Sequence, residues 1–262
     1  MSVIIVDMLA FGAVAGLLSG LFGIGGGIVL VPFMIWLFGR ADFPVESIVH
    51  MAIATSLATI IPTSFSSVLA HQRIGTLQWS AVAMIAPYMF IGAIMGSVIA
   101  AHLSGHLLKT VFAAYLIIVS LRMWLQNISS VSKTNASHLV MATAGAMIGT
   151  LSSLLGIGGG TLSVPFLTFY GYPMRNAVAI SAACGIPIAV AGSLGYAFLN
   201  KHHSSLPVYS LGYIYLPAFL ATIITSVCFA PLGAVMAKRL PVQPFKRLFA
   251  VIVFAVGIKL LW

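Results

Sequence analysis

Long apolar runs, interrupted by short polar stretches, follow one another along the whole chain. The first three runs without a charged residue cover residues 8–39, 47–72 and 74–108. A membrane-spanning helix needs about 20 mostly apolar residues to cross the hydrocarbon layer. The pattern therefore predicts an all-α polytopic membrane protein with eight apolar windows, four on each side of a polar linker.

The two sides of this linker resemble each other in sequence. Residues 12–33 read GAVAGLLSGLFGIGGGIVLVPF, and residues 145–166 read GAMIGTLSSLLGIGGGTLSVPF. Between residues 23–33 and 156–166, eight of eleven positions are identical at an offset of 133. Ser64 and Ser193 are a further matched pair. We therefore expect a first membrane repeat (1–125), a polar linker (126–138) and a second membrane repeat (139–262), a plan that many secondary transporters share.

The first apolar window of each half contains the sequence G-x-GGG, at residues 23–27 and 156–160. Each glycine costs a helix interior about 1 kcal/mol relative to alanine, so we expect the helix to break there. If each broken window counts as two segments, the chain has ten segments, five per half, and the repeats are inverted. Ten segments place eight basic residues on one side and four on the other, whereas eight spans place seven and five. Neither bias is decisive under the positive-inside rule. The matched loops 102–109 and 238–247 carry one and four basic residues and favour ten segments, and both counts place the two termini outside.

Composition narrows the class of protein. Hydrophobic residues make up 61% of the chain and charged residues 6%, with 12 Lys and Arg against 3 Asp and Glu. Soluble domains are usually about 25% charged, so a soluble enzyme is excluded, and a disordered chain would be poor in apolar residues. The basic residues lie at the ends of apolar runs, where they anchor a membrane protein, so we expect a lipid bilayer and no nucleic acid as partner. With so few carboxylates, an anion meets little repulsion.

A helix that restarts after the glycines would point free N–H groups and the positive end of its dipole into the gap. Such a helix start binds anions without a charged side chain. In lipid, unpaired backbone is tolerated only where it faces protein or a wet cavity, so we expect the two breaks to share a cavity, with nearby hydroxyls as further donors. The candidate substrate-binding residues are Gly23, Gly25, Gly26, Gly27, Gly156, Gly158, Gly159, Gly160, Ser19, Ser152, Thr55, Ser56, Ser64 and Ser193.

Two further residues are candidates for a gate or for ion coupling. His50 begins the second apolar run and has a reference pKa near neutrality, and Arg175 begins the matching run of the second half. Interfacial anchoring is the alternative role for Arg175. The sequence contains no metal-ligand spacing and no nucleotide-binding motif, so we expect no metal and no cofactor. A coupling ion, H⁺ or Na⁺, is left open.

The motif G-x-x-S-G-L-F-G-I-G-G-G-x-x-x-V-P-F at residues 16–33, with its second copy at 149–166, resembles the sulfite exporter TauE/SafE family, also called the 4-toluene sulfonate uptake permease family. The resemblance covers nearly the whole chain. It implies an inner-membrane transporter of small sulfur-containing anions or organic acids in a bacterium or archaeon. The second copy departs from the first where Thr55-Ser56 becomes Cys184-Gly185, which argues against a symmetric role for these positions.

The leading hypothesis is therefore a transporter, not an enzyme, that moves a small anion through a site formed by the two breaks. One alternative is a membrane assembly factor that transports nothing. Another is an intramembrane serine hydrolase using Ser19 and His50, although the second half has Ala179 where the first has His50. The sequence leaves open the exact substrate, the direction of transport and whether the protein forms a homo-oligomer.

Overall fold

The described part of the structure, a computed structural model, contains ten helices and one two-stranded hairpin. The structure describes residues 2–23, 25–41, 43–125, 137–199, 206–239 and 242–262. The elements are α1 (Ser2–Phe22), α2 (Gly27–Arg40), α3 (Val45–Ile74), α4 (Trp79–Ala100), α5 (Gly105–Leu125), α6 (His138–Leu155), α7 (Gly160–Phe169), α8 (Met174–Phe198), β1 (Ser210–Leu211), β2 (Ile214–Tyr215), α9 (Leu216–Arg239) and α10 (Val242–Leu261). Most of the predicted linker, residues 126–136, lies outside the described residues.

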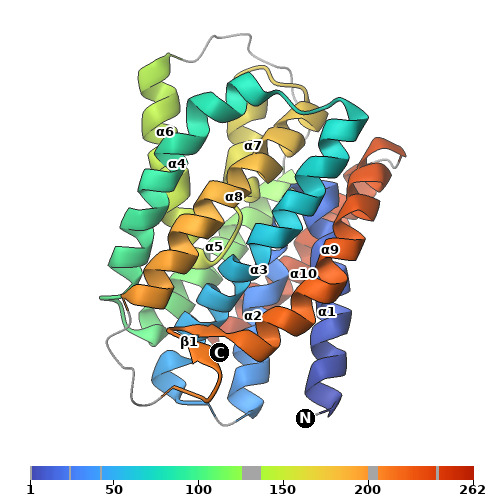
Figure 1. The fold of residues 1–262 in the computed structure, drawn as a ribbon. Helices are drawn as coiled ribbons and strands as arrows, with labels where there is room; N and C mark the ends of the chain where they lie inside the picture. Colours follow the sequence, from blue (N-terminus) through green and yellow to red (C-terminus); the bar gives the residue numbers. More distant parts are fainter. Residues whose placement is uncertain (1, 24, 42, 126–136, 200–205, 240–241) are drawn as a thin grey trace.

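The glycine motifs divide the first apolar window of each half into two helices, α1 and α2 in the first half and α6 and α7 in the second (Figure 1). The eight windows with a break in the first of each half are confirmed, and they contain the ten described helices. Both short helices continue past the proline that follows the glycines, at Pro32 in α2 and Pro165 in α7. Six of the described helices, α3 to α6, α8 and α9, are long and apolar enough to cross a membrane.

Small residues allow two pairs of helices to pack backbone against backbone. A Cβ at Gly20 of α1 would lie 1.9 Å from the carbonyl oxygen of Ala230 in α9, and a Cβ at Gly149 of α6 would lie 2.1 Å from that of Met89 in α4. In membranes such close approach replaces the hydrophobic effect between helices. Each pair joins the first helix of one half to the fourth helix of the other. This reciprocity is what two related halves would produce, but the repeat and its boundaries remain predictions.

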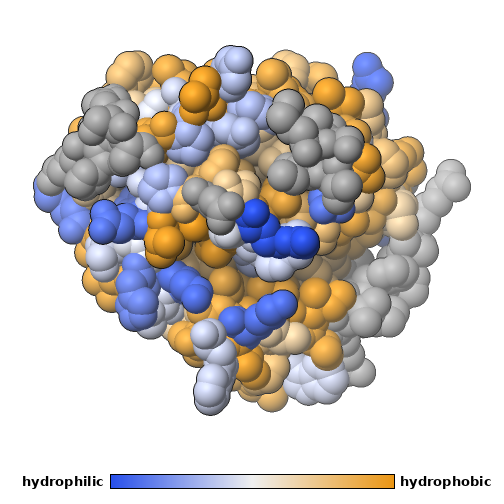
Figure 2. All heavy atoms as spheres, turned by 90° about the horizontal axis from the view of Figure 1, so that it is seen from below, coloured by the Kyte–Doolittle hydropathy of each residue, from blue (hydrophilic) through white to orange (hydrophobic). Residues whose placement is uncertain are grey.

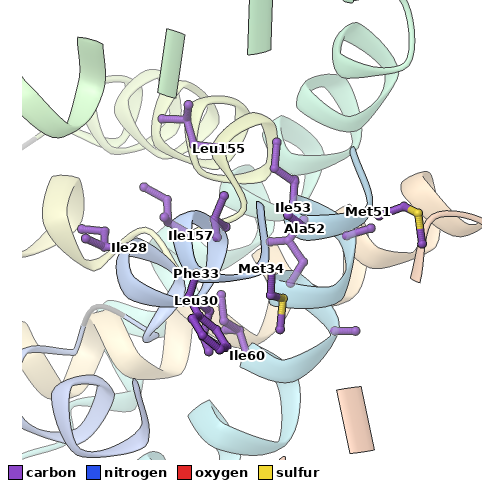
Figure 3. Packing of buried hydrophobic residues seen from close by; sticks show 14 of the residues in the cluster. Ile28, Leu30, Phe33, Met34, Met51, Ala52, Ile53, Ile60, Leu155 and Ile157 are labelled. Carbon is purple, nitrogen blue, oxygen red and sulfur yellow. The ribbon is translucent and has the colours of Figure 1, made fainter. Parts of the chain in front are cut away.

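The centre of the molecule is formed by α3 and α8, which contact each other along their length. The most apolar windows of these two helices are 83% and 78% buried, the highest shares among the candidate spans. Around them, buried aliphatic side chains of α2, α3 and the second break interdigitate, as Figure 3 shows for Ile28, Leu30, Ile53, Ile60 and Ile157. The glycine breaks therefore lie inside a packed core and not at the surface.

The outward faces of the outer helices are apolar. Large hydrophobic side chains are exposed on α4, α5, α9 and α10, among them Ile91, Ile118, Ile224 and Ile252. Exposed apolar surface of this extent is expected where helices face lipid chains. Both chain ends lie toward the lower side of Figure 1, and hydrophilic side chains break up the apolar surface at that end (Figure 2). The predicted common side of the termini agrees with this arrangement.

The connection between α8 and α9 contains a β-hairpin that the sequence pattern did not predict. Ser210 pairs with Tyr215 and Leu211 with Ile214, and Gly212 in the turn has a φ of 55°. The corresponding connection of the first half, residues 75–78, is short and holds no strand. The two halves therefore differ most where α8 leads into α9.

Candidate functional site

The backbone adopts the same conformation at two corresponding positions of each break. Gly23 and Gly156 end the preceding helices with φ values of 67° and 72°. Gly26 and Gly159 are the N-cap residues of α2 and α7, with φ values of 76° and 78°. The left-handed region costs a residue with a side chain about 1–2 kcal/mol, so the backbone geometry itself requires glycine at these positions.

The two breaks cross in direct contact. A Cβ at Gly25 would lie 2.9 Å from the Cα of Gly158, and a Cβ at Gly27 would lie 2.3 Å from the carbonyl oxygen of Gly156. All four residues are buried. The prediction that the two breaks come together is met, but backbone fills the crossing point itself. An open cavity between these four glycines is not what the structure shows.

Both short helices start at this crossing. The Gly26 carbonyl accepts hydrogen bonds from the N–H groups of Val29 and Leu30, at 3.1 Å each, and the Gly159 carbonyl accepts from Leu162 and Ser163 at 3.0 and 2.8 Å. The N–H groups of the residues before these donors have no acceptor within their own helix. Gly160 is the first residue of α7, as Gly27 is of α2. Two positive helix ends therefore begin at one buried point.

Serine hydroxyls without a hydrogen-bond partner among the described residues are buried in α3, α6 and α8. Those of Ser64 (α3), Ser152 and Ser153 (α6) and Ser193 (α8) belong to this group. Ser64 Oγ lies 2.9 Å from where a Cβ of Gly185 would stand, a point 3.3 Å from the Gly158 carbonyl oxygen. An unsatisfied buried polar group costs about 1–3 kcal/mol. Ser64 and Ser193, which occupy aligned positions in the two halves of the sequence, both carry this cost.

Ser152 adjoins the second break directly, since its Oγ lies 3.3 Å from where a Cβ of Gly159 would stand. Ser19, its counterpart in the first half, is buried, and its carbonyl accepts the Gly23 N–H at 2.8 Å. The structure therefore places Ser19, Ser64 and Ser152 at the breaks, as predicted.

The remaining predicted hydroxyls have structural partners. Ser56 Oγ donates to the carbonyl oxygen of Gly156 at 2.8 Å and so fixes the second break to α3. Thr55 Oγ1 accepts the N–H of Tyr215 at 3.0 Å, so this side chain holds the hairpin and not the breaks. Neighbouring residues in one apolar run therefore serve different parts of the molecule.

Sequence reasoning missed Ser181, which joins the two halves. Its Oγ donates to the Gly23 carbonyl at 3.1 Å and lies 2.8 Å from Ser163 Oγ. Ser163 Oγ in turn donates to the Gly159 carbonyl at 2.9 Å. Two adjacent hydroxyls thus lie between the carbonyls of the two breaks, and because each has one proton, at most two of these three contacts are hydrogen bonds at one time. Ser181 has no serine at the matched position, Ala52, so no repeat signal marked it.

The two candidate gate residues lie at opposite ends of the molecule. His50 is buried near the start of α3, with Nε2 3.2 Å from the Ala100 carbonyl oxygen and its ring stacked on Tyr213. Arg175 is in the first turn of α8, at the end where α3 finishes. Within the described ranges, no group of three or more His, Cys, Asp and Glu side chains is arranged to hold a metal ion.

A cavity of about 150 Å³ lies at the end of the molecule that carries Arg175. The lining residues come from α1, α3, α8 and α9 and from the loop after α3: Leu21, His71, Ile74, Thr76, Met174, Arg175, Val178, Ala234 and Ala237. Its wall reaches the first break, because the Val178 carbonyl oxygen would lie 2.6 Å from a Cβ at Gly23. His71 lies near the end of an apolar run, where a solvated side chain is expected. The structure instead buries this side chain, which is only 4% exposed.

Comparison with known proteins agrees with this architecture. Residues 8–260 match the sulfite exporter TauE/SafE family. A probable membrane transporter protein of Haemophilus influenzae is 35% identical over 253 residues, which cover 96% of both chains. A probable membrane transporter protein of Methanocaldococcus jannaschii is 27% identical, over 97% of this chain and 94% of its own. With its apolar helices and a match across nearly its whole length, the chain belongs to the sulfite exporter TauE/SafE family of multi-pass membrane transporters.

Proposed function

We propose that this transporter moves a small anion, a sulfur oxyanion or a small organosulfonate or organic acid, across the bacterial inner membrane past the crossing of the two breaks. The observation that carries the proposal is the matched pair of buried, unpartnered hydroxyls at Ser64 and Ser193. Burying each hydroxyl without a partner costs about 1–3 kcal/mol, and no hydrogen bond in this conformation offsets that cost. A substrate that accepts their hydrogen bonds would offset it.

The chemistry of the interior favours an anion. The buried polar side chains among the described residues are Ser, Thr and His, and none is a carboxylate. Hydroxyls and histidine donate hydrogen bonds to oxyanions, and two helix N-termini add positive partial charge. A cation in the same place would lack an acidic partner, which membrane transporters of cations commonly supply.

Because backbone closes the crossing, the substrate has to pass when the two halves move relative to each other. Rocking of one repeat against the other around a central site is common in transporters of this plan. At the crossing, Gly25 faces Gly158 and Gly27 faces Gly156 backbone to backbone, while side chains such as those of Ile60 and Val31 pack beside them. In this mechanism the crossing is the place where the pathway opens.

Charge suggests the orientation. Four connections, α3–α4, α5–α6, α7–α8 and α9–α10, fall on one side of the ten-helix arrangement, and eight basic residues belong to them by sequence position: Arg73, Arg122, Lys133, Arg175, Lys238, Arg239, Lys246 and Arg247. Arg40, Lys109, Lys201 and Lys259 belong to the other side. The positive-inside rule then assigns the first side to the cytoplasm and both termini to the outside.

The hydrolase alternative gains no support from the site. A serine nucleophile needs a base within about 2.6–3.2 Å. The His50 ring instead contacts Ala100 and Tyr213 near the start of α3, whereas Ser19 lies one turn before the end of α1, at the first break.

Reconstitution into liposomes tests the proposal. Uptake of radiolabelled sulfite, thiosulfate, sulfate, sulfoacetate and taurine is measured with and without proton and sodium gradients. We expect saturable uptake of at least one of these anions, and at least a ten-fold lower rate in the double variant Ser64→Ala/Ser193→Ala. Ser120→Ala is the matched control, because this buried serine already donates to the Ile117 carbonyl of its own helix, at 2.7 Å. Absence of uptake of every anion under all gradients would overturn the proposal.

A further inference from the structure

The cavity at the start of α8 combines three features that favour an anion. Arg175 and His71 line it together with Thr76. Arg175 is also in the first turn of α8, whose leading N–H groups have no acceptor within the helix and whose dipole presents its positive end. A permanent cation, an imidazole and a helix start therefore meet in one space.

His71 is held with one ring nitrogen engaged and the other unpartnered. Its Nδ1 lies 3.2 Å from Thr76 Oγ1, and the Thr76 N–H donates to the His71 carbonyl at 3.2 Å. The Gly20 carbonyl lies near enough to interact with the ring, yet Nε2 makes no hydrogen bond among the described residues. His71 is 4% exposed and lines the cavity, so a ligand bound there would contact its ring.

The size of the cavity limits the ligand. A volume of about 150 Å³ compares with about 30 Å³ for the share of one water molecule in the liquid. The space therefore holds an oxyanion of a few heavy atoms with some of its water. Apolar residues such as Leu21, Val178 and Ala234 form the rest of the wall, so the polar contacts are confined to one side.

We propose that this cavity is an anion-binding site that receives a small oxyanion of the size of sulfite, held by Arg175 and the first turn of α8 beside the ring of His71, before it passes the crossing. The site rests on the proposed transport function and names where the substrate first binds on that side. Val178, whose carbonyl packs on Gly23, forms the wall between this site and the first break.

Calorimetric titration of the purified full-length protein with sulfite tests the site. We expect Arg175→Gln and His71→Gln to raise the dissociation constant at least ten-fold, Arg175→Lys to raise it less, and Ala237→Trp to abolish binding by filling the cavity. Arg73→Gln, an exposed neighbour outside the lining, is the control with unchanged affinity. Thermal unfolding of each variant identifies those that fail to fold, and Arg175→Lys retains the charge if Arg175→Gln is lost.

The outcomes separate this site from the transport function. Wild-type affinity in folded Arg175→Gln and Ala237→Trp proteins, with uptake intact in liposomes, would overturn the site and leave the function standing. Wild-type protein that neither binds nor transports any of the five anions would overturn the function itself. We expect Ser64→Ala/Ser193→Ala to bind sulfite at the cavity with normal affinity while its uptake falls.

A second inference concerns the opposite end, where aromatic side chains of the hairpin are inserted between helices. The Tyr213 ring stacks on His50 with centroids 5.1 Å apart, and the Tyr213 N–H donates to the Tyr196 carbonyl at 3.3 Å. Tyr215 contacts the rings of Phe38 and Phe43 at 5.7 and 5.1 Å. These contacts join the hairpin to α2, α3 and α8.

Aligning the two halves of the sequence indicates which part of the molecule this hairpin covers. Arg175 and Ala237, which line the cavity, correspond by alignment to Glu46 and Ala100 in the first half. Ala100 contacts the His50 ring, on which Tyr213 stacks. The hairpin therefore occupies the place that matches the cavity on the other side.

We infer that the hairpin Ser210–Tyr215 is a plug that closes the second entrance and has to withdraw for the anion to pass, which also rests on the transport function. Thr55→Cys reports on the position of the hairpin, because Thr55 is fully buried and its hydroxyl accepts the Tyr215 N–H. In a background with Cys184 and Cys228 replaced by alanine, we measure how fast a charged thiol reagent modifies Thr55→Cys in liposomes. We expect Tyr213→Ala to raise the rate at least ten-fold, and Tyr213→Phe and the exposed Tyr209→Ala to leave it unchanged.

Sulfite added to the unmutated hairpin should also raise this modification rate, because transport requires the plug to open. Equal rates in Tyr213→Ala and Tyr213→Phe, or a rate that sulfite does not change in protein that transports it, would overturn the plug. Neither result depends on whether the cavity at Arg175 binds the anion.

Discussion

The close crossing of the two breaks is tested by adding a single methyl group to one of them. In Gly25→Ala the new Cβ would lie 2.9 Å from the Cα of Gly158, whereas carbon atoms prefer about 3.5–4.0 Å. Because the Gly158 Cα is a backbone atom that cannot rotate away, the two chain segments have to move apart by about 0.6–1 Å to restore that contact distance. Overpacking of this kind costs about 1–3 kcal/mol. The φ of 77° at Gly25 adds about 1–2 kcal/mol of left-handed strain.

Gly75→Ala is a matched control for that strain. Gly75 has a φ of 78°, and a Cβ there would meet nothing within 4 Å. It therefore carries the left-handed penalty of about 1–2 kcal/mol without the steric one. The difference in unfolding free energy between the two variants isolates the crossing, and we expect it to be about 1–3 kcal/mol.

Thermal unfolding of the purified variants in detergent measures this difference. Each kcal/mol corresponds to about 2–4 °C in Tm for a chain of this size class, so Gly25→Ala should unfold clearly below Gly75→Ala. Uptake by Gly25→Ala should fall as well, while Gly39→Ala, where a Cβ would also meet open space, should transport normally. Equal Tm values for Gly25→Ala and Gly75→Ala would refute the crossing of the two breaks as the structure shows it.

Three further predictions follow from the same contacts. Gly159 has a φ of 78°, and a Cβ there would lie 2.8 Å from Ile188 Cδ1. Gly159→Leu should therefore abolish uptake, measured as liposome flux, while the yield in the membrane fraction shows that the protein still inserts. Normal flux would remove Gly159 from the site. Ser163→Ala loses the hydrogen bond to the Gly159 carbonyl and should lower the unfolding free energy by about 1 kcal/mol, measured by thermal unfolding; no loss would contradict it. Gly20→Leu should separate α1 from α9 and prevent recovery of monodisperse protein by size exclusion, unlike Gly39→Leu.

In the proposed mechanism, the site and its two entrances form one pathway with unequal ends. The cavity beside Arg175 is open at one end, and the hairpin fills the matching place at the other. Ser64 and Ser152, two of the unpartnered buried serines, lie at the second break. A structure with one open and one closed entrance is what alternating access requires of each of its two end states.

Local sequence was enough to establish the helices and the breaks. The fold class followed from apolar runs, because lipid leaves a chain no alternative to internally bonded helices or closed barrels. The positions of the breaks at Gly23 and Gly156 followed from the glycine clusters, because backbone preference is a property of the residue and its neighbours. Proline was less decisive, since α2 and α7 run on past Pro32 and Pro165.

Tertiary structure alone decided which polar groups are left without partners. Thr59 and Ser64 both lie in one apolar run of α3, yet the Thr59 hydroxyl donates to the Thr55 carbonyl and that of Ser64 has no partner among the described residues. The burial of His71 and the position of the hairpin cannot be predicted from the periodicity of apolar residues either. These features depend on which helices meet across more than a hundred residues of sequence, and local patterns of apolar and polar residues carry no record of that pairing.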